Sequence, residues 1–111
     1  MSVTLAVLIP SKIAESSQTT QYTSTGVTTI IDKFTATNYS GSAATISINL
    51  VTLADTAGNQ NLVVKTKTLQ PAETYTFPEI VGQTLAASGF ISTIAGTATA
   101  INIRASGRQV T

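Results

Sequence analysis

The residues best suited to binding a ligand lie in one polar stretch, residues 55–61. Asp55 supplies a carboxylate before Gly58, and Asn59 and Asn61 supply amide oxygens after it. Oxygen atoms at such spacings are the ligands that Ca²⁺ takes in loops. One carboxylate among neutral amides binds Ca²⁺ weakly, however, and polar stretches of this kind usually connect two strands. We therefore expect a connecting loop here and no metal site.

A second pair of acidic residues, Glu73 and Glu79, flanks the short run that contains Tyr75 and Phe77. Two carboxylates on either side of a glycosidic bond are the machinery of glycoside cleavage. The spacing along the chain does not fix the distance between the two groups in space, and single glutamates on a surface are the ordinary case. We expect no catalytic pair at this place.

Two residue types that carry much of protein chemistry, His and Cys, are absent from the sequence. Their absence removes zinc centres, iron–sulfur clusters, thiol nucleophiles and Ser-His-Asp triads. Since His is the commonest general acid or base, we expect that the protein is not an enzyme. The sequence thus predicts no catalytic, cofactor-binding or metal-binding residues.

Two short motifs have simpler explanations than function. Asn38-Tyr39-Ser40 matches the glycosylation sequon, which matters only in a secretory pathway. The N-terminus has an apolar run but no positively charged region and no clear cleavage site, so it predicts a first strand and not a signal peptide. The glycines form no phosphate-binding array, and we expect them in turns and bulges.

Length and charge limit the classes of partner. The chain has 111 residues with 42% hydrophobic residues, which predicts a single domain over residues 1–111. Only 10% of residues are charged, and the formal net charge is +1, so there is no basic field for nucleic acid or for an anionic membrane. No apolar run approaches the roughly 20 residues that cross a bilayer. We expect neither nucleic acid nor membrane as a partner.

The elements that position these residues are strands. The sequence is rich in Thr, Ser, Val and Ile, and β-branched residues favour strands over helices. Over residues 26–38, alternation places one set of side chains on the inner face: Ile30, Phe34 and Ala36. Ile31 interrupts this alternation. Phe34 is the largest residue of the set, and we expect it in the centre of the core.

Further alternating runs predict the remaining strands. Residues 44–50 are expected to form a hairpin with residues 26–38, and residues 90–94 a closing hairpin with residues 98–104. Shorter strands are expected at residues 62–68 and 74–77. Residues 79–89 have no clear period and fit either a loop or a short helical turn. About seven or eight strands at such intervals predict an all-β fold, a two-sheet β-sandwich of Ig-like or jelly-roll type.

The N-terminal segment, residues 1–20, differs from the rest of the chain. A strongly apolar run in which Val3, Leu5, Val7 and Ile9 share one parity precedes a polar stretch. Such a segment is either an edge strand of its own sandwich or an arm that adds a strand to a neighbouring subunit. We expect burial in its own domain, because pairing within one chain avoids the entropy cost of association.

Five segments in chain order carry a resemblance: TIIDKFTATN (29–38), SAATISINL (42–50), LQPAETY (69–75), PEIVG (78–82) and RASGR (104–108). In this order they resemble small virion structural proteins of tailed bacteriophages, over about residues 20–111. The resemblance implies a non-enzymatic β-sandwich on the virion, as a capsid decoration protein or at the neck or collar. It implies other virion proteins as partners (major capsid protein or the neck and portal region), a homo-oligomer and a location in the virion. It carries over no catalytic residue.

The composition agrees with that expectation, because a protein whose surface becomes interface can replace charge with Thr, Ser, Asn and Gln. The alternative is a carbohydrate- or receptor-binding β-sandwich, as in an adhesin or a fibre-associated module. Sugar-binding platforms typically need exposed aromatic side chains. Trp is absent here, and aromatic residues make up 5% of the chain.

Overall fold

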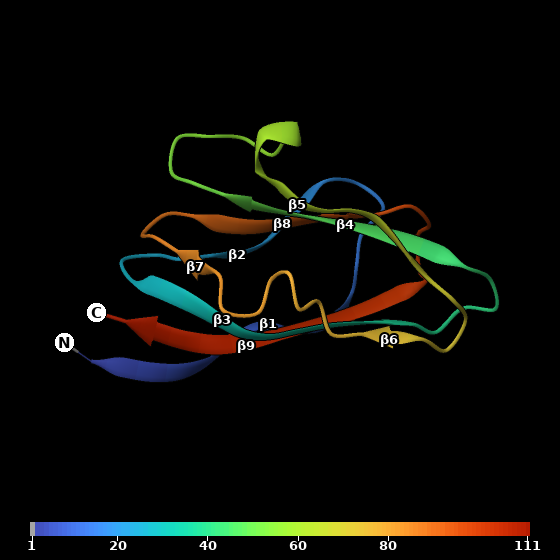
Figure 1. Cartoon of the computed structure of the whole chain (residues 1–111), viewed down its shortest axis with the longest axis horizontal. Helices are drawn as coiled ribbons and strands as arrows, with labels where there is room; N and C mark the ends of the chain where they lie inside the picture. The colour runs from blue at the N-terminus through green and yellow to red at the C-terminus, as the bar shows by residue number, and fades with distance from the viewer. Residues whose placement is uncertain (1) are drawn as a thin grey trace.

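The computed structural model describes residues 2–111 and has two antiparallel sheets that pack face to face (Figure 1). The nine strands among residues 2–111 are β1 (Val3–Ile13), β2 (Thr19–Thr23), β3 (Thr28–Asn38), β4 (Ala44–Val51), β5 (Leu62–Leu69), β6 (Thr74–Tyr75), β7 (Thr84–Leu85), β8 (Phe90–Ala95) and β9 (Ile101–Val110). One 3-10 turn, η1 (Asn59–Asn61), precedes β5. The predicted all-β, two-sheet sandwich is confirmed. The strands outnumber the predicted seven or eight because the sequence analysis did not predict β2, in the polar stretch after β1, or the two-residue strand β7.

The strand order distinguishes between the two predicted sandwich types. Sheet A has the order β1-β9-β3-β6, with β7 also paired to β3, and sheet B has the order β2-β8-β4-β5. The chain therefore pairs β1 with β9, β2 with β8, β3 with β6 and β7, and β4 with β5, all antiparallel. This is one long hairpin whose turn lies between β4 and β5, rolled up so that its strands divide between two sheets. Such a rolled hairpin is a jelly roll.

The two predicted hairpins are wrong, because their strands lie in different sheets. β3 and β9 belong to sheet A, whereas β4 and β8 belong to sheet B. The connections 39–43 and 96–100 cross between the sheets at the same end, where the N–H of Tyr39 donates to the carbonyl of Ala100 at 3.0 Å. Alternation shows that a strand has one apolar face. It does not show whether a short connection joins two strands of the same sheet, as in a hairpin, or passes from one sheet to the other.

The core lies between the sheets and is mostly aliphatic. Phe34 from β3 is fully buried, as predicted, and meets Phe77 edge to face with ring centroids 5.1 Å apart. Phe77 stands at a positive φ of 46° at the start of the irregular segment before β7. A single turn follows, in which the N–H groups of Ile80 and Val81 donate to the carbonyl of Phe77. Residues 79–89 are thus a turn, a short strand and a further turn, and not a helix.

The inner face predicted for residues 26–38 needs one correction. Phe34 and Ala36 point inward, but Ile31 is fully buried and Ile30 only half-buried on the other face. The reason is a register shift between Ile31 and Lys33 against β9, which reverses the alternation before it. A bulge adds one residue to one strand, so a pattern of two-residue period cannot continue through it.

Candidate functional site

The stretch around Asp55 is a loop held by its own hydrogen bonds. Asp55 accepts hydrogen bonds from the N–H of Thr56 (2.8 Å) and the side-chain amides of Gln60 (3.1 Å) and Asn61 (3.3 Å). The N–H of Thr56 contributes most to lowering the pKa of the Asp55 carboxyl, and the Gln60 amide adds to it. The carboxylate therefore faces N–H donors, and Asn59 is exposed and not gathered with it.

The same loop is tied to sheet B by a buried amide on β4. The side chain of Asn49 donates to the carbonyl of Gly58 at 3.0 Å and to the amide oxygen of Asn61 at 2.8 Å. That oxygen also accepts the N–H of Gly58. The oxygens that could have bound Ca²⁺ thus hold the β4–β5 connection in place. The sequence analysis missed Asn49, whose only signal is an amide within an apolar strand.

The two other acidic candidates have separate partners. Glu73 accepts the N–H of Gln70 at 2.7 Å and closes the turn before β6. Glu79 accepts the hydroxyl of Tyr75 at 2.8 Å, and this bond to a carboxylate raises the pKa of Tyr75. The ammonium of Lys67 lies over the Tyr75 ring, 4.4 Å from its centre. Each carboxylate has its own role on the surface, so the structure does not bring them together as a catalytic pair.

The sequon residue Asn38 is fully buried at the end of β3. Its side-chain amide donates to the carbonyls of Ser42 (2.8 Å) and Leu69 (2.9 Å), and its oxygen accepts the N–H of Ser40 (2.9 Å). The side chain thus satisfies three groups of the connections between the sheets. A glycan could not be attached to this nitrogen in the folded chain.

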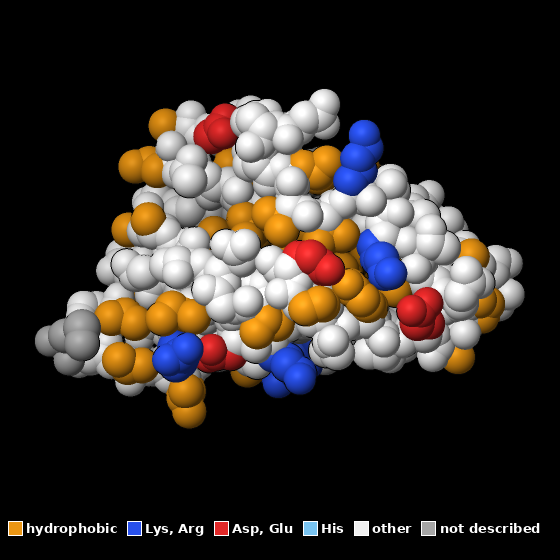
Figure 2. All heavy atoms as spheres, in the orientation of Figure 1, with side chains coloured by type: hydrophobic (Ala, Val, Ile, Leu, Met, Phe, Trp, Pro, Cys, Tyr) orange, Lys and Arg blue, Asp and Glu red, His pale blue; other side chains and the backbone are white. Residues whose placement is uncertain are grey.

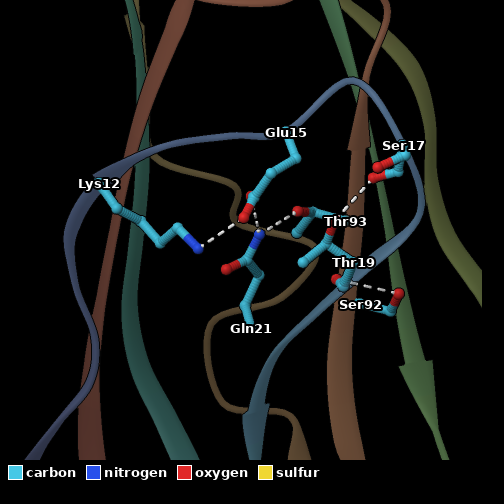
Figure 3. A network of polar contacts seen from close by, with 7 residues as sticks. All are labelled: Lys12, Glu15, Ser17, Thr19, Gln21, Ser92 and Thr93. Atoms are coloured by element: carbon cyan, nitrogen blue, oxygen red, sulfur yellow. Dashed lines mark hydrogen bonds and ion pairs between the residues drawn. The ribbon is translucent and has the colours of Figure 1, made fainter.

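A polar network joins the connection after β1 to sheet B (Figure 3). Glu15 accepts from the ammonium of Lys12 at 2.9 Å and from the amide of Gln21 at 2.8 Å, and these two bonds lower its pKa. The same Gln21 amide donates to the hydroxyl of buried Thr93 at 3.0 Å. The backbone adds a bond from the N–H of Ala95 to the carbonyl of Glu15. These contacts anchor the C-terminal end of β1, which makes the network structural.

The free edge of β1 is a surface that the packing of this chain leaves uncovered. β1 is the outermost strand of sheet A, and three apolar side chains of its first half face outward: Val3 is 55% exposed, Leu5 82% and Val7 51%. Figure 2 shows hydrophobic side chains gathered at the end of the molecule where the first half of β1 lies. We call Val3, Leu5 and Val7 the β1 stripe.

The β1 stripe corrects the prediction for the N-terminal segment. The strand pairs with β9 of its own chain, and Ile9 is fully buried, as expected for burial in its own domain. Val3, Leu5 and Val7 are not buried with it, because a register shift between Val7 and Ile9 reverses the alternation. The first half of the strand consequently turns its apolar side chains away from the core.

The outer face of sheet A beside the β1 stripe carries one ion pair and one further cation, Lys33, which is exposed on β3 opposite Ser106. Leu5 lies opposite Arg108 on β9, and the Arg108 guanidinium makes a two-pronged pair with Asp32 of β3, with N–O distances of 2.9 to 3.2 Å. The carboxylate raises the pKa of Arg108. A shallow groove beside the pair is lined by Leu5, Ala6, Val7, Asp32, Ser106 and Gly107. The β1 stripe itself is apolar, and the charge opposite Leu5 is paired, which suits contact with another protein.

A second groove lies where the β4–β5 loop meets the segment around β7. Its polar side chains come from Asp55, Gln60, Asn61 and Gln83, and Leu50, Leu62 and Leu85 supply apolar surface. No aromatic side chain lines this groove. It offers hydrogen-bonding groups to a small ligand but no ring on which a sugar could stack.

Comparison of the chain with protein-family models, curated proteins and solved structures finds no match. Within residues 2–111, no three acidic, histidine or cysteine side chains gather closely enough to hold a metal ion. The described part of the chain also contains no helix long and apolar enough to cross a membrane.

Proposed function

We propose that this chain is a non-enzymatic virion structural protein of a tailed bacteriophage, which binds capsid or neck proteins as a decoration, cement or collar component. The observation that carries the proposal is the β1 stripe, an apolar surface on the free edge of a sheet. Proteins normally hide or charge such edges, because unpaired strand groups attach to other chains. A strand edge left apolar is therefore best explained by a partner that covers it.

The low charge of the chain supports the same proposal. A freely diffusing domain usually carries about 25% charged residues, whereas this chain has 10%. Charged residues are depleted in the buried centres of interfaces. A protein whose surface is buried against neighbours in an assembly needs fewer charged surface residues than a monomer needs for solubility.

The segments that resemble those of virion proteins form hydrogen bonds that hold the fold together. In LQPAETY, the carbonyl of Glu73 accepts the N–H of Asn38, and the N–H of Ala72 donates to the carbonyl of Asn38. In PEIVG, Gly82 has a φ of +89° and donates its N–H to the carbonyl of Ile31. The resemblance thus rests on residues that hold the sandwich together, and it supports a shared fold more than a shared ligand site. Jelly rolls occur in viral capsid proteins, which adds an argument by analogy.

A carbohydrate- or receptor-binding role is the alternative, and it would use the groove at the β4–β5 loop. Asp55, Gln60 and Gln83 there present oxygens and amide groups to solvent. Binding of an isolated glycan or of host-cell envelope that Gln83→Ala abolishes would favour this role.

Particles of the phage whose genome encodes the chain provide the test of the proposal. Gradient-purified particles are analysed by quantitative mass spectrometry, and gold-labelled antibody locates the protein on them. We expect a fixed ratio to the major capsid protein that survives a salt wash, since the contact is apolar. Absence from purified particles, with the protein present in the infected-cell lysate, would overturn the proposal.

A further inference from the structure

We propose that two copies of this chain pair through the free edge of β1, antiparallel and with Leu5 opposite Leu5, so that their A sheets join into one continuous sheet. The inference deepens the proposed function, because it names a surface through which copies of the protein meet. Its test is made in solution and can fail while incorporation into particles succeeds.

The direction of the backbone groups follows from the pairing of β1 with β9. The N–H of Ser2 donates to the carbonyl of Thr111 at 3.3 Å, and the N–H of Thr111 donates to the carbonyl of Ser2 at 3.0 Å. Such an exchange marks a hydrogen-bonded pair, and these pairs alternate with non-hydrogen-bonded pairs along an antiparallel ladder. Val3, Leu5 and Val7 occupy the non-hydrogen-bonded positions of the unshifted register. Their own N–H and C=O groups therefore point away from β9, toward the free edge.

The open backbone groups and the exposed apolar side chains thus belong to the same three residues. An added strand would receive main-chain hydrogen bonds from Val3, Leu5 and Val7 and would also cover their side chains. Arg108, directly opposite Leu5, is already paired with Asp32, so a second copy brings no unpaired charge to this point. An identical chain offers the same apolar edge.

Symmetry selects one register. A two-fold axis at Leu5 sets Leu5 against Leu5 and Val3 against Val7, so every residue of the β1 stripe meets another of the same kind. Moving the axis to residue 4 would leave Val7 opposite a residue that precedes β1. Moving it to Ala6 would set Val3 against Ile9, which lies beyond the register shift and is buried in its own core. The β1 stripe matches itself completely only around Leu5.

The strand itself limits the contact to its first half. The register shift after Val7 ends the regular edge, and Pro10 has no N–H to offer. A contact this short covers less than a standard protein interface. We expect a reversible dimer with a Kd of about 10–100 µM, which the density of copies on a particle would favour further.

Sedimentation velocity across a range of protein concentrations measures the association. The wild-type chain should shift from monomer to dimer as concentration rises, and Leu5→Lys should remain a monomer, because Lys is a residue that protects strand edges. The matched control is Leu53→Lys, which changes a leucine of 69% exposure in the β4–β5 loop, away from β1. Circular dichroism confirms that both variants are folded. A wild-type chain that stays monomeric up to about 1 mM, tenfold above the expected range, would overturn the inference.

Cysteine scanning tests the register. The sequence contains no Cys, so an introduced Cys can cross-link only with another introduced Cys. Leu5→Cys should cross-link to itself on oxidation, since hydrogen-bonded antiparallel partners have Cα atoms about 5.5 Å apart, within disulfide range. Val3→Cys should not cross-link to itself. In the proposed register Val3 lies opposite Val7 of the second copy, so the two Val3 positions are four residues apart along the strands, or about 14 Å. A mixture of Val3→Cys with Val7→Cys should cross-link.

Each other result has a definite meaning. Self-linking of Val3→Cys, or a dimer that persists in Leu5→Lys, would show a different interface and overturn the inference. A chain that is monomeric in solution but present on particles would overturn this contact and leave the virion role standing. A protein that dimerises in solution but is absent from particles would overturn the virion role and leave this contact standing.

Discussion

Phe34 lies at the centre of the core, and truncation of its side chain tests which face of β3 points inward. The ring is fully buried and packs edge to face on Phe77. Phe34→Ala should lower the free energy of unfolding by about 3–5 kcal/mol, measured by urea denaturation. Thr35→Ala, the next residue on the outer face, is the control and should cost much less. A loss under about 0.5 kcal/mol for Phe34→Ala would contradict the assignment of this face.

Gly107 is required for another reason, the close approach of two strands. A Cβ built on Gly107 would overlap the carbonyl oxygen of Ile30 on β3, at the register shift of that strand. Gly107→Ala should therefore force the strands apart and lower the melting temperature by several degrees. Gly41→Ala is the control, because nothing lies within 4 Å of an added Cβ there. Equal melting temperatures for the two variants would show that the approach of β9 to β3 is less close.

Glu15 predicts a pH dependence of stability. Hydrogen bonds from Lys12 and then Gln21 lower its pKa from 4.5 in the folded chain, so its contribution is present above pH 4.5 and is lost as pH falls through the folded pKa. The melting temperatures of wild type and Glu15→Gln should differ at pH 7 and converge toward pH 3. The side chain is partly exposed, so the difference is small. In Lys12→Gln the dependence should weaken, and a difference that grows on acidification would contradict this assignment.

At the scale of elements, the two halves of β1 differ in how deeply their apolar side chains are buried. Ile9 is fully buried, while Leu5 is mostly exposed, although both lie on the same strand. Ile9→Ala should cost about 2–5 kcal/mol of unfolding free energy, and Leu5→Ala should leave stability nearly unchanged. Denaturation of the two variants at concentrations low enough to keep the chain monomeric makes the comparison. Equal losses would mean that the first half of β1 is also buried in its own domain.

The elements also show how far the sequence could be interpreted. Strand positions followed from alternation, because side chains on a strand point to opposite faces in turn. The register shifts in β1 and β3 did not follow, since a bulge depends on the neighbouring strand, and the interruption of the alternation at Ile31 does not show which residues keep the inner face. For this reason alternation predicts Ile30 on the inner face and the β1 stripe in the core, whereas the structure has Ile30 half-buried on the other face and the β1 stripe exposed.

The candidate site was harder to predict than the fold. Polar residues such as Asp55 and Asn38 stood out in the sequence, but they are used in holding connections between strands. Val3, Leu5 and Val7 were noticed as an apolar set, yet their exposure depends on the direction of one half of one strand. A surface of this kind becomes visible only when the pairing of the strand is known.

At the scale of the whole molecule, the jelly roll explains why the predicted hairpins failed. In a rolled hairpin, strands distant in sequence are paired, as β1 is with β9, and most neighbours in sequence lie in opposite sheets. Local patterns cannot give the sheet to which a strand belongs. The same rolling makes β1 an edge strand and leaves its outer side free.

An electron cryo-microscopy map of the parent phage particle tests the central claim, that the protein is a virion component in which another protein chain covers the free edge of β1. We predict density for this jelly roll on the head or neck, with Val3, Leu5 and Val7 covered by a second copy or by a neighbouring virion protein. A particle whose map accounts for every protein without this fold, or one in which the free edge of β1 faces solvent in all copies, would contradict it.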